Sequence, residues 1–228
     1  MSSDFEKRYI DARRKLIESD FASLNPMQRK AVMATEGPLL ILAGAGSGKT
    51  STMTHRIAYM IKEKNVNPYN ILAVTFTNKA AREMRDRVEN LVGAGLNIWM
   101  LTFHSACLRI LRSHAELLGY GRDFAVYDPT DQKTLIKNIT KEMNIDNKRY
   151  NPAYFLGNIS HCKEKQISAK EYAAVYGDDI KAKMIGDVYA EYDKRLKKNN
   201  AMDFDDLLLN TVRLFEKDEE VLIKYQNR

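Results

Sequence analysis

The chain has 228 residues, of which 44% are hydrophobic and 29% are charged, as is ordinary for a soluble globular protein. This length allows one large domain or two small ones. The formal net charge of +6 suits contact with nucleic acid phosphates, although many basic proteins bind none. No apolar run is long enough to span a bilayer, and the charged stretch from Met1 to Leu16 lacks the apolar centre of a signal peptide. We therefore expect a cytoplasmic protein.

The chain contains two cysteines, Cys107 and Cys162, which are far apart in the sequence. His161 adjoins Cys162, but nothing nearby completes a set of four zinc ligands. The sequence therefore predicts two reduced thiols and no metal centre built on them.

The first half of the sequence alternates strand and helix patterns. Apolar, β-rich segments predict short strands at residues 37–43, 71–76 and 98–103. Helical periodicity follows each of them, at residues 49–61, 78–91 and 104–118. Alternation of this kind implies βαβ units, so we expect an α/β fold in which a parallel sheet is flanked by helices.

The pattern changes after Tyr120. A short apolar piece at residues 124–127 leads to Asp128 and Pro129, a helix cap followed by a first-turn proline. From there on, helical patterns dominate the sequence.

These later helices are expected near residues 129–143, 152–164 and 178–198. The segment from Ser168 to Glu171 has the form of a capping box. We interpret residues 1–112 as the first part of a sheet domain, 113–200 as a mostly helical insertion, and 201–228 as helices that return to the sheet domain.

The strongest local signal is a glycine-rich segment that follows an apolar strand and precedes a helix. It consists of Ala43, Gly44, Ala45, Gly46, Ser47, Gly48, Lys49 and Thr50. Glycines let backbone N–H groups fold around a phosphate, and the helix N-terminus adds a favourable dipole. In such a P-loop, Lys49 reaches the β- and γ-phosphates and the Thr50 hydroxyl binds Mg²⁺. Ala43 stands where glycine is usual, and it is small enough to be tolerated there.

Segments on both sides of this loop resemble the start of superfamily 1 DNA helicases of the UvrD/Rep/PcrA type. In the family's order they are residues 24–32 (LNPMQRKAV), 43–50 (AGAGSGKT), 54–57 (THRI), 74–84 (VTFTNKAAREM), 102–105 (TFHS), 128–132 (DPTDQ) and 202–207 (MDFDDL). They are spread over nearly the whole chain. The resemblance implies a RecA-like P-loop fold and an ATP-dependent DNA helicase whose cofactors are ATP and Mg²⁺.

The resemblance assigns Gln28 to the Q motif, in which a glutamine recognises the adenine ring. The residues allow a second role, because Asn25, Pro26 and Gln28 also stand where an N-cap, a first-turn proline and a capping-box glutamine would stand. We expect that one rotamer cannot fill both roles, and we favour the adenine contact. In close relatives an arginine near the nucleotide usually follows Gly-Lys-Thr, whereas this chain has Ser51.

Two further segments match motifs that contact single-stranded DNA in the family. They are Phe76, Thr77 and Asn78 in motif Ia, and Thr102, Phe103 and His104 in motif Ib. A strand end that carries an aromatic ring and small polar groups suits stacking of a base and binding of a phosphate. The alternative is that Phe76 belongs to the core and Asn78 caps a helix.

Three arginines follow these motifs, Arg109, Arg112 and Arg122. They extend a basic track on one interpretation and form solvated surface charge on the other. His104 has no carboxylate or cysteine beside it, so we expect neither a metal ligand nor a catalytic base there.

The family's next motif, a buried strand that ends in Asp-Glu and holds Mg²⁺, is expected beyond Arg228, as is a second motor domain with arginine fingers. Asp203, Asp205 and Asp206 follow a polar segment instead of a buried strand, and Asp203 is expected to cap an amphipathic helix. We therefore expect the isolated chain to bind nucleotide without hydrolysing it.

Together these features predict the N-terminal ATP- and DNA-binding portion of a 3′–5′ helicase motor that acts in repair or replication. Its expected partners are single-stranded DNA, single-strand/duplex junctions and the C-terminal motor domain, with no membrane. One alternative is an inactive nucleic-acid-binding module. The other is an unrelated P-loop NTPase, which would not explain the segments around Gln28 and Phe76.

Overall fold

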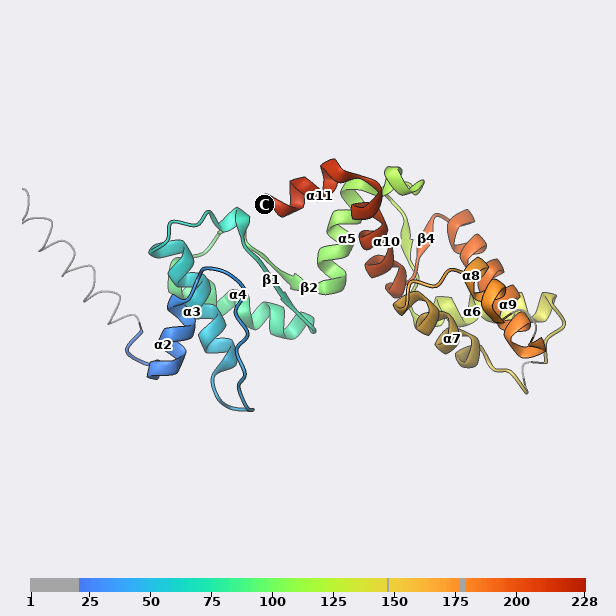
Figure 1. Cartoon of the computed structure of the whole chain (residues 1–228), viewed down its shortest axis with the longest axis horizontal. Coiled ribbons are helices and arrows are strands. Elements are labelled where there is room, and N and C mark those ends of the chain that lie inside the picture. The colour runs from blue at the N-terminus through green and yellow to red at the C-terminus, as the bar shows by residue number, and fades with distance from the viewer. Residues whose placement is uncertain (1–20, 147, 177–178) are drawn as a thin grey trace, which may run out of the picture. The chain divides into compact units, whose positions relative to one another are not determined.

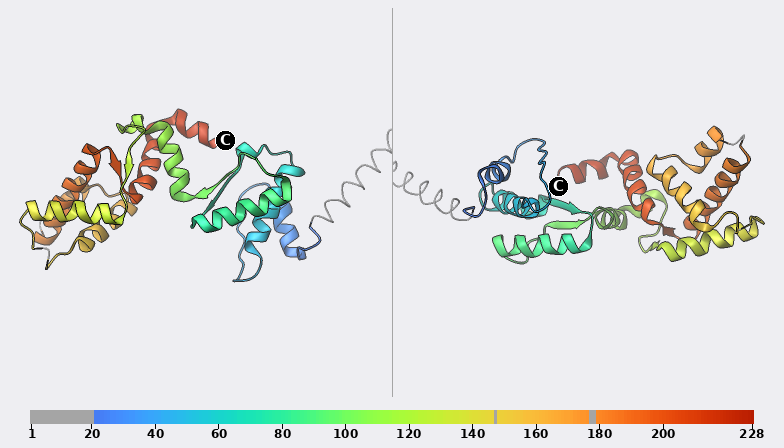
Figure 2. Two further views of the ribbon diagram at one scale, coloured as in Figure 1. Left: turned by 180° about the vertical axis from the view of Figure 1, so that it is seen from behind. Right: turned by 90° about the horizontal axis from the view of Figure 1, so that it is seen from below.

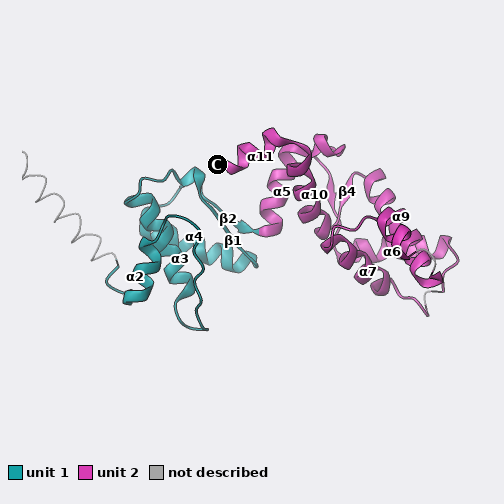
Figure 3. Ribbon diagram, in the orientation of Figure 1, with its two compact units in different colours: residues 1–102, 228 teal, residues 103–227 magenta. Residues whose placement is uncertain are grey.

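A computed structural model describes residues 21–228 except 147 and 177–178. The stretch from Met1 to Leu16, for which we predict no signal peptide, lies outside the described residues. Contacts divide the chain into two compact units, which Figure 3 distinguishes by colour. Unit 1 comprises residues 1–102 with Arg228, and unit 2 comprises residues 103–227. This division does not test the domain boundaries expected after residues 112 and 200, which stay a prediction.

Unit 1 is a small α/β assembly. Its described elements are α2 (Pro26–Met33), α3 (Lys49–Lys62), the 3-10 turn η1 (Pro68–Asn70), β1 (Leu72–Thr75), α4 (Asn78–Val92) and β2 (Trp99–Thr102). The two strands are parallel, with Leu72 opposite Trp99 and Thr75 opposite Thr102. The predicted strands at residues 71–76 and 98–103 and the predicted helices at 49–61 and 78–91 are thereby confirmed within one to three residues.

The core of unit 1 forms where α4 packs on the strands (Figure 1). The buried side chains of α4 recur at Ala81, Met84 and Val88, which is the spacing of one helix face. Met84 and Val88 meet Ile57 of α3 and alternate residues at the start of both strands in one apolar cluster. At the end of the chain, the Arg228 guanidinium lies 3.6 Å from the ring centroid of Tyr69 and 4.1 Å from that of Trp99.

The strand expected at residues 37–43 is not formed. Within the described part of the chain, that segment joins neither sheet, and its side chains Leu40 and Leu42 are 81% and 86% exposed. The β preference of an apolar segment depends on a neighbouring strand and a surface to pack against, and the segment has neither here. Among the described residues of unit 1 the sheet therefore has two strands, without the full parallel sheet predicted from the sequence.

Unit 2 is mostly helical. It contains α5 (Phe103–His114), η2 (Ala115–Leu118), β3 (Ala125–Val126), α6 (Pro129–Glu142), α7 (Pro152–Glu164), α8 (Ala169–Tyr176), α9 (Ile180–Lys198), β4 (Ala201–Met202), α10 (Phe204–Lys217) and α11 (Glu219–Gln226). The short strands β3 and β4 pair in parallel. The two views of Figure 2 show α6, α7 and α9 grouped together, and their buried apolar residues form one cluster. No described helix of either unit is long and apolar enough to cross a membrane.

Local capping explains why the helices of unit 2 start where the sequence predicts. Asp128 accepts hydrogen bonds from the backbone N–H groups of Thr130 and Asp131, and Pro129 occupies the first turn of α6. Ser168 and Glu171 exchange the two hydrogen bonds of a capping box, as expected. The helices predicted at residues 129–143 and 152–164 are confirmed to within one residue.

A buried lysine joins three helices of unit 2. Lys163 of α7 is 1% exposed, and its Nζ lies 2.9 Å from Asp203 Oδ2, 2.8 Å from Asp206 Oδ1 and 3.5 Å from Asp193 Oδ1. Burial lowers the pKa of Lys163, but the three carboxylates together raise it above its ordinary value. The ammonium is therefore charged at neutral pH and ties α7 to α9 and α10.

Two of the aspartates around Lys163, Asp203 and Asp206, have the structural role predicted for them. Asp203 caps α10 and forms a capping box with Asp206. Asp203 also accepts a hydrogen bond from the Tyr192 hydroxyl at 3.0 Å. Burial raises the pKa of Asp206 to about 6, because the cost of desolvating the carboxylate exceeds the pull of Lys163.

We predict that Lys163→Met will destabilise the protein by about 3–5 kcal/mol at pH 7.5, because it leaves buried carboxylates without a cation. Urea unfolding followed by circular dichroism measures this change. Lys165→Met, which removes an exposed lysine two residues away, is the matched control and should have little effect. Equal stability of the two variants would contradict a structural role for the buried charge.

The raised pKa of Asp206 makes stability depend on pH. An unfolded aspartate loses its proton near pH 3.9, whereas folded Asp206 keeps it to about pH 6. Between these values the folded state binds more protons, so this group makes stability fall as pH rises. Asp206→Asn removes the titrating group at the cost of one contact with Lys163, so we predict that its stability relative to the wild type will rise between pH 4 and pH 7, by up to about 3 kcal/mol. Unfolding curves across this range, with Asp205→Asn as control, test the prediction; parallel profiles would refute it.

Candidate functional site

The glycine-rich loop of unit 1 is closed by its own hydrogen bonds. The Ser47 hydroxyl donates to Gly44 O at 2.7 Å, and the Ser47 N–H donates to the same oxygen at 3.3 Å. Gly46 and Gly48 have φ angles of +74° and +80°, in the left-handed region that favours glycine. The chain thereby turns sharply into α3, which begins at Lys49.

The first turn of α3 presents groups that suit a phosphate. Gly48 is the N-cap and provides no side-chain acceptor for the N–H groups of this turn. The Lys49 ammonium folds back over the loop, where its Nζ lies 3.0 Å from Ala43 O and 2.6 Å from Gly44 O. A phosphate oxygen is a stronger acceptor for an ammonium than a carbonyl oxygen. The loop, the helix N-terminus and Lys49 thus form a cradle for an anion.

Thr50 and Ser51 follow Lys49 on α3. The Thr50 side chain is exposed at the start of the helix, where its hydroxyl can reach a cation held by bound phosphates. Ser51 Oγ lies 3.4 Å from His55 Nδ1, one turn further along. Among the described residues, no group of three or more histidine, cysteine or acidic side chains is arranged to hold a metal ion.

Gln28 joins α2 to the glycine-rich loop. Its Oε1 accepts from the Asn25 N–H at 2.9 Å and Asn25 Oδ1 accepts from the Gln28 N–H, which completes the capping box. Its Nε2 donates to Ser47 O at 2.9 Å. The capping role is therefore present. Contact with an adenine ring stays a prediction, and one amide has enough donors and acceptors for both, since one Nε2 hydrogen and one Oε1 lone pair remain.

A cavity of about 510 Å³ lies between α2 and the loop. Its wall contains Asn25, Met27, Gln28, Lys30, Ala31, Ala34, residues 39–42, Ala43, Gly44, Ser47, Lys49 and Thr52. The polar and charged groups come from the loop and the start of α2, whereas residues 39–42 supply an apolar side. A nucleotide, with a charged phosphate chain and a flat base, has the same division.

The residues of motif Ia lie at the carboxyl end of β1. Phe76 is 93% exposed, so the alternative in which it belongs to the core is wrong. Thr77 caps α4 by accepting a hydrogen bond from the Ala80 N–H at 3.1 Å, and Asn78 is the first residue of that helix. The exposed ring of Phe76 therefore directly precedes the N-cap of α4 in the sequence. An aromatic ring next to a helix N-terminus suits binding of a base and a phosphate.

The residues of motif Ib divide between the two units. Thr102 ends β2, is 8% exposed, and lies opposite Thr75 of β1, so both strands end at the same edge. Phe103 and His104 begin α5 of unit 2. Phe103 is 44% exposed, and the His104 ring lies 5.7 Å from the ring of Phe204.

Two of the three arginines expected to extend a basic track, Arg112 and Arg122, make local contacts in unit 2. Arg112 donates to Arg122 O at 2.6 Å, and its guanidinium lies 4.0 Å from the Phe124 ring centroid. Arg122 forms an ion pair with Glu116 at 3.1 Å. These contacts give Arg112 and Arg122 local structural roles, which the sequence did not predict.

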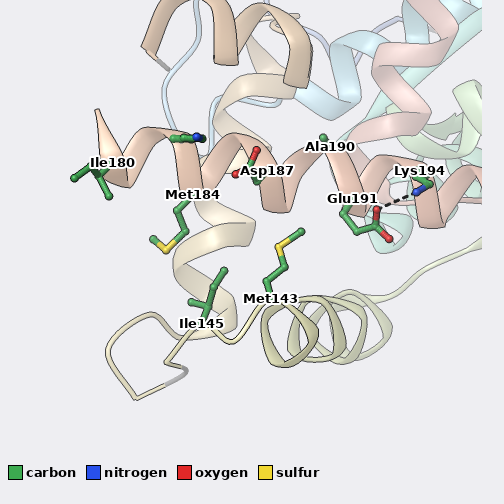
Figure 4. Close-up of a pocket in the computed structure, with 9 residues that line it drawn as sticks. Met143, Ile145, Ile180, Met184, Asp187, Ala190, Glu191 and Lys194 are labelled. Carbon is green, nitrogen blue, oxygen red and sulfur yellow. Dashed lines mark hydrogen bonds and ion pairs between the residues drawn. The ribbon is translucent and has the colours of Figure 1, made fainter. Parts of the chain in front are cut away.

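Another cavity, of about 630 Å³, lies in unit 2 (Figure 4). Met143 and Ile145 line one side of it, and Ile180 and Met184 of α9 line the other. Its charged groups include the ion pair between Glu191 and Lys194, which are 3.4 Å apart. The residues that line this cavity include no glycine-rich loop. The candidate phosphate site is therefore the one in unit 1.

Comparison with known proteins identifies the family. The profile of the UvrD/REP helicase N-terminal domain matches residues 24–228. The chain is 53% identical over 207 residues to the ATP-dependent DNA helicase PcrA of Staphylococcus epidermidis. It is 52% identical over 206 residues to the protein of the same name from Staphylococcus aureus. Each match covers 90% of this chain, and the chain spans 28% of the length of these curated relatives. The chain thus belongs to the UvrD/REP helicase family and corresponds to its N-terminal domain.

Proposed function

We propose that this chain is the ATP- and DNA-binding part of a helicase motor that moves 3′ to 5′ along single-stranded DNA. The observation that carries the proposal is the closed glycine-rich loop, with Lys49 above it and Gln28 hydrogen-bonded to Ser47 O. The similarity to ATP-dependent DNA helicases supports it. Unwinding of duplexes in repair or replication, single-strand/duplex junctions as substrates and a cytoplasmic location are parts of the same proposal.

The nucleotide would lie with its phosphates in the loop and its base beside α2. The backbone of residues 44–48 and the first turn of α3 would hold the phosphate oxygens, and Lys49 would balance their charge. Thr50 would bind Mg²⁺, which supplies charge neutralisation at the β- and γ-phosphates. Ala43, Ala45, Gly46 and Ser51 complete the proposed contact set.

We propose that the chain by itself binds nucleotide without sustained hydrolysis. Hydrolysis needs a carboxylate that holds Mg²⁺ and a group that orients the attacking water. Asp203 and Asp206 are engaged by Lys163 and by the cap of α10, which makes them poor candidates. In the whole protein, a second motor domain with arginine fingers would complete the reaction and couple it to movement.

Single-stranded DNA would be bound by Phe76, Thr77 and Asn78 at the end of β1, and by Thr102, Phe103 and His104. The 93% exposed ring of Phe76 offers a stacking surface. Lys79, whose side chain is 86% exposed, adds charge beside it. The net charge of +6 favours the same partner.

We predict that Lys49→Ala will weaken the binding of Mg²⁺-ATP by about 10- to 100-fold, the usual loss for a hydrogen bond between charged groups. Titration with a fluorescent ATP analogue measures this change, and turnover with and without single-stranded DNA is followed in parallel. Lys64→Ala, an exposed lysine beyond the end of α3, is the control and should bind normally. Unchanged ATP affinity in Lys49→Ala would exclude the loop as the nucleotide site. DNA-stimulated turnover that depends on Lys49 would exclude an inactive isolated chain.

We predict that Phe76→Ala will weaken the binding of labelled single-stranded DNA by about 5- to 100-fold, since stacking of one base contributes about 1–3 kcal/mol. The dependence of affinity on salt should stay unchanged, because stacking releases no counterions. Lys79→Ala should instead reduce the salt slope by about one unit. Ile180→Ala, which removes a side chain that is 87% exposed in unit 2, serves as control. Equal affinity of Phe76→Ala and the control would remove Phe76 from the DNA site.

A further inference from the structure

Arg56 of α3 closes the end of α2. Its Nη1 donates to Ala31 O at 2.7 Å and also to Ala34 O. Ala31 lies in the last turn of α2 and Ala34 is its C-cap, so these oxygens are among those that a helix leaves without an intrahelical donor. A cation at this end also interacts favourably with the helix dipole.

The two ends of α2 are therefore held by the segment that forms the phosphate cradle. At its start, Gln28 Nε2 donates to Ser47 O in the loop. At its end, Arg56 donates from α3, the helix that the loop opens. Arg56 follows Lys49 by seven residues, or about two helical turns, so both side chains leave the same face of α3.

Apolar packing supports α2 independently of Arg56. Val32 is fully buried and packs with Phe21 and Leu24, with Tyr59 of α3 against the same cluster. This cluster fixes α2 on α3 but does not contain Gln28. The guanidinium adds a directional restraint, because its N–H groups point along fixed directions at two backbone oxygens.

We infer that Arg56 is a positioning residue for the nucleotide: it sets the register of α2 against the loop, and thereby the contact of the α2 face with the base. The inference rests on the proposed ATP site. In that site two parts of the cavity bind two parts of the nucleotide. The loop holds the phosphates, and α2 with its N-cap supplies Asn25, Gln28 and Ala31 to the opposite wall, beside the nucleoside. Loss of Arg56 therefore weakens recognition of the nucleoside, while binding of the phosphate chain persists.

The test compares Mg²⁺-ATP with Mg²⁺-tripolyphosphate, which has the phosphate chain but no nucleoside. Both are titrated by calorimetry against the wild type, Arg56→Met, Arg56→Lys and Arg85→Met. Arg85 donates to Met100 O at 3.1 Å and does not line the cavity, so it is a matched control for the loss of an arginine-to-carbonyl contact. For Arg56→Met we expect ATP affinity to fall about tenfold, and tripolyphosphate affinity to change less than about twofold.

Arg56→Lys keeps the charge without the planar donor group, so its ATP affinity should lie between those of the wild type and Arg56→Met. It also decides the question if Arg56→Met fails to fold. Parallel loss of both ligands in the Arg56 variants, or an unchanged ratio of the two affinities, would overturn the inference. If the wild type bound neither ligand, the proposed function itself would fail.

Discussion

The left-handed backbone at Gly48 is the constraint on which the rest of unit 1 depends. With φ at +80°, the chain leaves the loop and enters α3 in one residue, so that Lys49 already belongs to the helix. A Cβ at this position would lie 2.7 Å from Gln28 Nε2. The left-handed φ therefore favours glycine at this turn, and a side chain there would also displace the Gln28 amide from its place beside the loop. The turn into α3 and the position of Gln28 thus both depend on a residue without a side chain.

Unit 2 depends on a different kind of interaction, a charge that would be very costly to bury alone. Lys163 lies among three carboxylates, and two of them, Asp203 and Asp206, also form the capping box of α10. A buried cation of this kind costs more to leave unpaired than it contributes when paired. The buried lysine therefore mainly restricts how α7, α9 and α10 can pack against one another. The apolar cluster that contains Tyr189 and Tyr192 supplies buried apolar surface, which stabilises the packed helices.

Features encoded within one turn of the chain could be predicted from the sequence, and features that depend on distant groups could not. The caps at Asp128, Ser168 and Asp203 were predictable, because each acceptor and its donor are two or three residues apart. That residues 37–43 form no strand was not predictable, since strand formation requires a partner that local preference does not specify. The contacts of Arg56 and Lys163 were not predictable for the same reason, because their acceptors lie 22 to 43 positions away in other helices.

The hydrogen bonds of Gln28 leave groups free for the adenine contact that we propose. The capping box uses one lone pair of Oε1, and Ser47 O uses one hydrogen of Nε2. The amide thus retains one acceptor and one donor in the same plane, the pair with which a carboxamide can meet an adenine edge. A glutamine already fixed by two hydrogen bonds loses little side-chain entropy when it binds a third partner. Capping α2 therefore orders the side chain that would recognise the base, and a structural role and a binding role support each other at one residue.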